Sequence, residues 1–493
     1  MDEQFPQSIG NILVWLDGEF FNKETFGGTG LSDAQLVLEQ YRSGMLVPFL
    51  QKVDGIFAAV IYDRTKKSVT VVNDRYGLRY LYILRSPSGC AWASELKAFR
   101  CLPSRSLTID REAATLFFLE GYLSGNRTWF RDVELLAPGT MLTIKCATGE
   151  TSALHYREWN AISARNKKHD IPELARELGV RFKRAVERQC RTGERIGLGL
   201  SGGLDSRAIF AAMPSHCEPI QTFTFGMADS KDLRIAQKVT ALRPSKHCSY
   251  ELSANNWLQN RTDAVWWTDG QFNLLHMHGV EHAGAIRENF EVTLNGFQSD
   301  ALLGACYENS EGAEIPKYPD RDRRFIAMGV TLATQEIIYR IPFFDNDFME
   351  LTMSIPLRYR RNSYIFHKML LLTFPEYYQD IPWQRTNMPI SRNRPFDKAL
   401  ILAIKCARRL ASKFKVRLRD NDYTDYPSWI RQPPARGFFT GLLTDTHARV
   451  FDFVDPALIR RCLDRHMHGL NYSEQIGRYA TFEVWLRRFY RSG

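Results

Sequence analysis

The stretch GLGLSGGLDSRAIFAAM, residues 197–213, decides the fold of the larger part of the chain. Its apolar start predicts a buried parallel strand, and its end predicts a helix that begins directly after a short loop. Gly202 and Gly203 let the loop backbone approach a ligand closely. The N–H groups at the start of the helix, with the hydroxyls of Ser201 and Ser206, form a cradle for an anion. The pattern therefore predicts a phosphate-binding loop between a strand and a helix.

Asp205 is the unexpected member of this loop, because a carboxylate repels phosphate. Its presence is explained if a divalent cation lies between the carboxylate and the phosphates. The loop is not a Walker A motif, since no Gly-Lys-Ser/Thr follows at the required spacing. A purely structural joint between a strand and a helix is the less favoured interpretation.

Length and composition bound the class of protein. At 493 residues the chain is too long for one ordinary core, so two or three domains are expected. A content of 44% hydrophobic and 24% charged residues is that of a globular protein. No apolar run is long enough to span a bilayer and no signal peptide is recognisable, so we expect a cytoplasmic protein. Nine cysteines without a C-x-x-C pair indicate reduced thiols, neither a disulfide framework nor a zinc site.

Much of the net charge of +10 lies between residues 358 and 419. Here Leu402, Cys406, Leu410 and Lys413 recur at helical spacing beside basic residues, which predicts a basic amphipathic helix. Such a helix can lie on a membrane or on phosphate. The favoured interpretation is a solvated helix face over the core. Nucleic acid is not expected as a partner, because the chain carries no recognised nucleic-acid motif.

The residue pattern changes, about a third of the way along the chain, from one typical of strands to one that alternates helices and strands. Residues 1–155 are expected to be rich in strands, because ILVWLDGEFF, GIFAAVIYD, SVTVVND and TMLTIKCATGE are short apolar runs bounded by turn residues. A helix is predicted from a cap at Ser32 to Gly44. Residues 156–171 are polar and aperiodic and form the predicted linker. Residues 172–493 alternate helical patterns with short buried strands, which is typical of an α/β domain with a parallel sheet, and helices dominate toward the end.

The SGGLDS loop resembles the pyrophosphate-binding loop of the N-type ATP pyrophosphatases, which cleave ATP to AMP and pyrophosphate. Three further segments narrow the resemblance to the asparagine synthetase family: FTFGMADSKDLRIAQKV (223–239), LNGFQSDALLG (294–304) and RIPFFDNDFMELTMSIP (340–356). They resemble, in order, the adenine-side strand, the second phosphate-side loop and the helical region that follows in that family.

This resemblance implies a PP-loop synthetase domain that binds ATP and Mg²⁺. It implies ATP contacts at Leu200, Ser201, Gly202, Gly203, Leu204, Asp205, Ser206, Phe225 and Gly296. It also implies that Asp205 and Asp300 hold Mg²⁺ and act in catalysis. In such an enzyme ATP converts a carboxylate to an acyl-adenylate, and ammonia or an amine then attacks the activated carbonyl. The loop and the metal stabilise the charge that develops on pyrophosphate.

The N-terminal part carries a second resemblance. The segments DGEFFN, VDGIFAAVIYD, VVNDRYGLRYLYI and ASELKAF occur in the order of a class II glutamine amidotransferase domain. This implies an Ntn-type, β-rich α+β sandwich over residues 1–155. A working glutaminase domain of this family begins with a catalytic cysteine after the initiator Met. Here Asp2 follows Met1 and the first cysteine is Cys90, so we expect a truncated domain without glutaminase activity.

Two positions of the synthetase domain depart from the family pattern. Phe297 stands where the family usually has Glu, and phenylalanine can neither accept nor donate a proton. Asn387 aligns with a family lysine that stabilises charge. Arg385, Arg392 or Lys368 are the candidates to supply that charge instead, and we assign Lys368 and Arg385 a catalytic role. Phosphate binding is therefore expected to be intact and the acceptor chemistry to be altered.

Two other motifs are better explained by packing than by a separate function. His278, Glu281 and His282 stand in the H-x-x-E-H order of a zinc peptidase family. No third ligand is identifiable, so capping or packing histidines are favoured over a metal site. Near the C-terminus TFEVWLRRFY predicts a helix that buries Trp485.

Three functions stay open on the sequence. The first is an asparagine synthetase-like amide ligase that joins ammonia or an amine to a small-molecule or peptide carboxylate. The second is a β-lactam or lasso-peptide macrolactam cyclase of the same family, because an internal amine removes the need for glutamine. The third is an ATP-binding protein without catalysis. A homodimer is considered possible, and no membrane span is expected.

Overall fold

The computed structural model describes residues 6–86, 89–102, 107–157, 170–297, 337–392 and 422–490, with short pieces between 303 and 335 and between 403 and 410. These residues form two compact units. The described parts of 1–164, 316–327 and 344–346 make up the first unit, and those of 165–315, 328–343 and 347–493 make up the second. Asp300, most of the predicted linker and most of the predicted basic helix lie outside the described residues.

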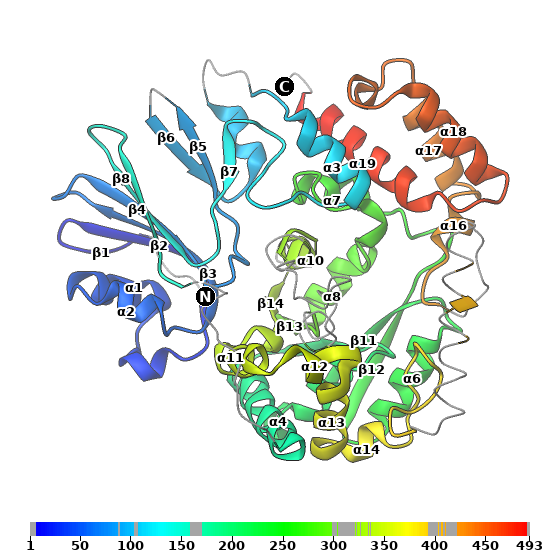
Figure 1. Cartoon of the computed structure of the whole chain (residues 1–493), viewed down its shortest axis with the longest axis horizontal. Helices are drawn as coiled ribbons and strands as arrows, with labels where there is room; N and C mark the ends of the chain where they lie inside the picture. The colour runs from blue at the N-terminus through cyan, green and yellow to red at the C-terminus, as the bar shows by residue number, and fades with distance from the viewer. Residues whose placement is uncertain are drawn as a thin grey trace. The chain divides into compact units, whose positions relative to one another are not determined.

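The first unit contains two antiparallel sheets (Figure 1). The larger has the strand order β1-β2-β3-β4-β8-β9 and the smaller β6-β5-β7. The strands are β1 (Gln7–Ile9), β2 (Ile12–Phe20), β3 (Gly55–Asp63), β4 (Ser68–Asn73), β5 (Tyr82–Ser86), β6 (Gly89–Ala93), β7 (Val133–Leu135), β8 (Thr140–Lys145) and β9 (Thr151–His155). Apolar side chains of the two sheets share one cluster, which includes Val71, Ile83, Leu136 and Leu142. The predicted β-rich sandwich is confirmed.

The other face of the larger sheet is covered by α1 (Asp33–Arg42) and α2 (Leu46–Leu50). The predicted cap is present: the Ser32 hydroxyl accepts from the Gln35 N–H (3.2 Å), and the Gln35 side chain accepts from the Ser32 N–H (2.8 Å). This capping box satisfies two N–H groups that a helix otherwise leaves without a partner. The remaining helix of this part is α3 (Arg111–Glu120).

Short segments from late in the chain complete the first unit. The buried guanidinium of Arg323 donates to the carbonyls of Gly77 (3.0 Å) and Leu136. Arg324 donates to the carbonyls of Gly125 (2.6 Å) and Arg127 (2.8 Å). Buried charges persist when backbone acceptors satisfy them, so these arginines fix the late segment to the early one. The sequence predicts domains made of continuous stretches. It does not predict that the described parts of 316–327 and 344–346 belong to the first unit.

The second unit is built on a five-stranded parallel sheet with the order β12-β11-β10-β13-β14. Its strands are β10 (Ile196–Gly199), β11 (Ile220–Gly226), β12 (Ser245–Glu251), β13 (Val292–Leu294) and β14 (Ile338–Arg340). The predicted α/β fold with a parallel sheet is confirmed. Figure 1 shows α6 running beside β11 and β12.

Helices surround this sheet and dominate the last part of the chain, as predicted. They are α4 (Ile171–Arg188), α5 (Asp205–Ala212), α6 (Lys231–Thr240), α7 (Arg261–Trp267), α8 (Ala283–Asn289), α10 (Ala327–Ala333), α11 (Asn346–Ser354), α12 (Leu357–Arg360), α13 (Tyr364–Thr373), α14 (Pro375–Tyr378), α16 (Tyr426–Trp429), α17 (Ala435–Thr444), α18 (Pro456–Met467) and α19 (Ser473–Phe489). Trp485 of α19 is fully buried, as its spacing predicts. Over the residues that were placed, we find no helix long and apolar enough to cross a membrane.

Candidate active site

The loop between β10 and α5 lies at the C-terminal edge of the parallel sheet. β10 is the middle strand, between β11 and β13. The hydroxyl of Thr224 donates to the Leu200 carbonyl (2.5 Å), and the Leu200 N–H donates to the Phe223 carbonyl (2.8 Å). These two hydrogen bonds fix the position at which the loop leaves the sheet. Ligands of α/β proteins bind at this edge.

The N–H groups of the loop donate to side-chain oxygens of the chain. The Ser201 N–H donates to the Ser206 hydroxyl (3.1 Å), and the Gly203 N–H donates to the Ser201 hydroxyl (3.2 Å). The Gly202 N–H donates to the carboxylate of Asp232 (2.9 Å). Three consecutive N–H groups thus donate to three separate side-chain oxygens, those of Ser206, Asp232 and Ser201. Oxygens of a phosphate can replace those acceptors without a change in the loop's donor pattern.

The carbonyl groups of Gly202 and Leu204 are held by Arg207 of α5 and by the segment 377–384. Arg207, which is fully buried, donates to the carbonyls of Gly202 (3.2 Å) and Pro382 (2.9 Å). The Tyr378 hydroxyl donates to the Leu204 carbonyl (2.7 Å). Burial lowers the pKa of Arg207. Because C=O and N–H point in opposite directions across a trans peptide, these contacts turn the next N–H groups away from that segment.

Gly296 brings the end of β13 against the start of α5. A Cβ atom at Gly296 would lie 2.7 Å from the Cβ of Asp205 and 2.9 Å from the Ser206 nitrogen. Only glycine allows this approach, since backbone atoms cannot move aside cheaply. Asp205 therefore stands between two chain segments that the resemblance assigns to phosphate binding. Its expected partner Asp300 lies outside the described residues.

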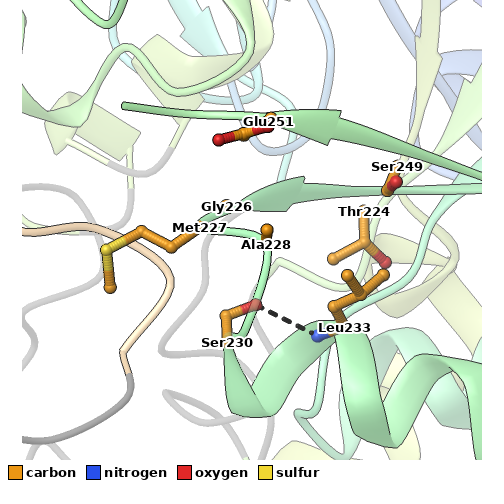
Figure 2. Close-up of a pocket in the computed structure, with 8 residues that line it drawn as sticks. All are labelled: Thr224, Gly226, Met227, Ala228, Ser230, Leu233, Ser249 and Glu251. Atoms are coloured by element: carbon orange, nitrogen blue, oxygen red, sulfur yellow. Dashed lines mark hydrogen bonds between the residues drawn. The ribbon is translucent and has the colours of Figure 1, made fainter. Parts of the chain in front are cut away.

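Asp232 and Gln384 are site residues that the sequence interpretation missed. Asp232 is buried in the first turn of α6, and burial raises its pKa. The Gln384 amide, turned with its nitrogen toward the carboxylate, donates to Asp232 (2.7 Å to Oδ2). The helix cap at Ser230, whose hydroxyl accepts from the Leu233 N–H (3.3 Å), is a sequence signal that places Asp232 at a helix start. Figure 2 shows this cap beside the end of β11.

A small pocket of about 80 Å³ lies at that end of β11. It is lined by Thr224, Gly226, Met227, Ala228, Ser230, Leu233, Ser249 and Glu251 (Figure 2). Thr224 lines this pocket and also a larger cavity beside the loop, so the two spaces adjoin.

The larger cavity has a volume of about 460 Å³ and is lined in part by the loop. Of the residues predicted to bind ATP or metal, it is lined by Leu200, Ser201, Gly203, Asp205, Ser206, Phe225 and Gly296. Gly202 and Leu204 belong to the same loop but are not among the residues that line the cavity. The Gly202 N–H donates to Asp232, and the Leu204 carbonyl accepts from Tyr378. The structure therefore brings the predicted loop, the adenine-side strand and the second phosphate-side segment to one cavity.

The structure does not bring the predicted cationic residues to this cavity. Lys368 is exposed on α13, and Arg385 is exposed beside the ring of Trp383 (5.6 Å from its centroid). Asn387 closes a tight turn: its N–H donates to the Trp383 carbonyl (2.8 Å) and its φ is 57°. Phe297, in contrast, lines the cavity. The catalytic role of Lys368 and Arg385 stays a prediction.

His278 is held in a buried network of hydroxyls. Its Nδ1 lies 2.7 Å from the Tyr426 hydroxyl and its Nε2 lies 3.0 Å from the Tyr423 hydroxyl. Arg261 donates to the same Tyr426 hydroxyl (2.9 Å) and pairs with Glu281. Burial, then the nearby Arg261 charge, hold the pKa of His278 well below its usual range, so the ring is neutral.

The second histidine of the H-x-x-E-H motif, His282, has different partners from His278. His282 is stacked on Tyr250 and lies 3.1 Å from the Glu251 carbonyl. Across the described part of the chain, no group of three or more His, Cys, Asp or Glu side chains is placed to hold a metal by itself. Mg²⁺ commonly binds through one or two carboxylates and the phosphates of its substrate. Asp205, in a loop whose N–H groups donate to oxygen acceptors, fits that mode.

Comparisons with known proteins agree with both halves of the chain. The family described as glutamine amidotransferase domain matches residues 18–157, and the family described as asparagine synthase matches residues 177–324. Glutamine-hydrolysing asparagine synthetase 2 of Bacillus subtilis is 26% identical over 346 residues, which cover 64% of this chain and 46% of that protein. The human glutamine-hydrolysing asparagine synthetase is 25% identical over 385 residues, which cover 70% of this chain and 65% of that protein.

The chain thus spans about half to two thirds of the length of these relatives. Among solved structures, the glutamine phosphoribosylpyrophosphate amidotransferase of B. subtilis, complexed with ADP and GMP, aligns with a TM-score of 0.20 and 15% identity. That alignment covers 45% of this chain and 48% of the other.

Proposed function

We propose that this chain, which belongs to the asparagine synthetase family at modest identity, adenylates a carboxylate with ATP and passes the acyl group to ammonia or an amine. The observation that carries the proposal is the loop 200–206, which lines the cavity. Three of its N–H groups donate to side-chain oxygens that phosphate oxygens can replace, and Gly296 holds β13 against the same helix start.

Each residue of the loop has a part in this proposal. The N–H groups of Ser201, Gly202 and Gly203 bind the oxygens of the leaving pyrophosphate, where negative charge develops. Asp205 holds Mg²⁺, which when bound neutralises charge on the phosphates. Arg207 and Tyr378 keep the loop rigid from behind, so that its donors need no rearrangement during the reaction.

The source of nitrogen is proposed to be free ammonia or an amine. Cys90 in the first unit is half-buried, and burial raises the pKa of its thiol, which disfavours the nucleophilic thiolate. An assay of glutamate release from glutamine tests this part, and release above the background of a Cys90→Ser control would contradict it. A homodimer stays a prediction.

The experiment for the main proposal is titration calorimetry with ATP and Mg²⁺, together with exchange of labelled pyrophosphate into ATP. Wild-type protein is expected to bind ATP only with Mg²⁺ present. Asp205→Ala is expected to lower affinity or turnover by about a hundredfold or more, since it removes the carboxylate that holds the metal. Asp263→Ala, on the exposed side of α7, is the matched control. Unchanged ATP–Mg²⁺ affinity together with unchanged pyrophosphate exchange in Asp205→Ala would overturn the proposal.

A further inference from the structure

We infer that the carboxylate accepted by this site carries an apolar side chain, such as an aryl or branched alkyl group, and not a second charged group as in aspartate. The inference rests on the proposed function and names its substrate class. It follows from what surrounds the cavity beyond the loop.

Much of the cavity is lined by apolar side chains. They come from β11, α8, α10 and β14 and from the residue before β14. These are Phe223, Phe225, Ile286, Leu332, Ile337 and Tyr339. Phe223 and Ile286 also belong to one buried apolar cluster against which Phe225 and Ile337 pack. Apolar surface of this kind binds apolar ligand groups by removing both surfaces from water.

Phe297 closes this wall at the point where β13 ends. Its ring centroid lies 6.3 Å from that of Tyr339, at an interplanar angle of 35°. A Cβ at Gly329 would lie 3.3 Å from the Phe297 ring, so the ring also packs on that backbone. The Phe297 N–H donates to the Asn295 side chain (2.9 Å), which fixes the backbone from which the ring projects. The residue that replaces the family's Glu is therefore part of an aromatic surface.

The charged groups of the cavity suit one carboxylate and its adenylate, not a second anion. Along the part of the lining that the structure describes, there is no Lys or Arg. The two acidic side chains there, Asp205 and Asp232, lie at the loop. His276 faces Glu474 (3.1 Å), and His278 is held between two tyrosine hydroxyls. A second carboxylate buried against the described lining would have no Lys or Arg partner there, which is costly.

Adenine is the competing explanation for an apolar wall, because a purine is also flat and largely apolar. Phe225, the predicted contact on the adenine side, lines this cavity, so an experiment must separate the two occupants. Leu332 lines the cavity from α10, outside the loop and β11, and Leu372, exposed on α13, offers a matched leucine outside the cavity.

The test measures exchange of labelled pyrophosphate into ATP, with acetate, aspartate or 3-phenylpropionate supplied as the carboxylate substrate. Because each methylene in an apolar pocket is worth about 10–200-fold in specificity, 3-phenylpropionate is expected to exceed acetate and aspartate at least a hundredfold in kcat/KM. Leu332→Trp is expected to raise the KM for 3-phenylpropionate at least tenfold and to leave the KM for ATP unchanged. Leu372→Trp is expected to change neither.

The outcomes separate the inference from the proposed function. Preference for aspartate, or a rise in the KM for ATP alone in Leu332→Trp, would overturn the inference while adenylation stands. If no acid supports exchange, calorimetry of 3-phenylpropionate binding decides. Binding that Leu332→Trp weakens tenfold keeps the inference and removes the proposed activity, and absence of binding overturns the inference.

Discussion

The backbone N–H of Gly202 donates a hydrogen bond to the carboxylate of Asp232 at 2.9 Å. One of the donors of the proposed phosphate-binding loop is therefore engaged by a carboxylate of the chain itself. Burial raises the pKa of Asp232, and the nearby Asp422 raises it further. An incoming phosphate competes for the same N–H and meets the repulsion of an ionised Asp232.

We expect Asp232→Asn to bind ATP more tightly, by several fold, because the amide oxygen still accepts from Gly202 while the negative charge is gone. In the wild type, affinity should fall as the pH rises through the raised pKa of Asp232, above the ordinary range near 4. The Asn variant should show no such fall. Calorimetry over a pH series at fixed Mg²⁺ measures both effects, and a loss of ATP binding in Asp232→Asn would instead make Asp232 a metal ligand.

A second prediction concerns the close approach at Gly296. In Gly296→Ala the new Cβ would stand 2.7 Å from the Cβ of Asp205, so the end of β13 must move away from α5. We expect a loss of about 1–3 kcal/mol in the free energy of unfolding and weaker ATP–Mg²⁺ binding. Gly441→Ala on α17 is the matched control, because no atom lies within 4 Å of its Cβ position. This change should stabilise by about 0.5–1 kcal/mol. Equal effects of both variants in urea unfolding would contradict the assignment.

A third prediction concerns pH and the buried His466. Burial, then the nearby Arg431, lower its pKa to about 4, and its Nδ1 accepts from the Tyr472 N–H (3.1 Å). A folded pKa below the unfolded value near 6.5 means that this contribution to stability is complete above pH 6.5 and is lost as the pH falls toward 4. The loss is on the order of 3 kcal/mol.

Urea midpoints at pH 7.5 and 5.0 measure this loss. His466→Gln should narrow the difference between the two midpoints, since glutamine keeps an acceptor and does not titrate. His468→Gln, at an exposed position directly after α18 ends, should leave the difference as in the wild type. If His466→Gln also leaves it unchanged, other groups carry the acid sensitivity.

The sequence predicted those features whose cause is local. β3 follows GIFAAVIYD residue for residue, because an apolar run bounded by turn residues has few alternatives. The loop and its helix were predicted for the same reason: glycines, hydroxyls and a helix start are adjacent in the chain. Gly296 was predicted as a binding residue only through a resemblance, because nothing local shows that it meets Asp205.

Features that depend on distant parts of the chain were not predictable in this way. Asp232, Gln384 and Tyr423 come to the cavity from three separate segments, and their sequence neighbourhoods carry no sign of it. Lys368 and Arg385 were chosen for their charge, but charge does not tell which face of a helix or turn a side chain occupies. The structure places both on exposed faces.

The last prediction concerns Phe297, where the family's carboxylate is replaced by a ring. A carboxylate beside the reacting carbonyl assists proton removal from the attacking amine, and such assistance is typically worth 10²–10⁴-fold. Phe297→Glu restores the group, but it places an unpaired carboxylate against Tyr339 and Gly329, where the described lining offers no Lys or Arg. Burial without a partner costs a few kcal/mol. We therefore expect Phe297→Glu to lower the urea midpoint and to form no asparagine from aspartate, ammonia and ATP. Phe297→Leu, which keeps the wall apolar, should retain most of the wild-type midpoint. A clear gain of asparagine synthesis in Phe297→Glu would show that the pocket still accepts a small acidic substrate and differs from an ordinary synthetase by a single substitution.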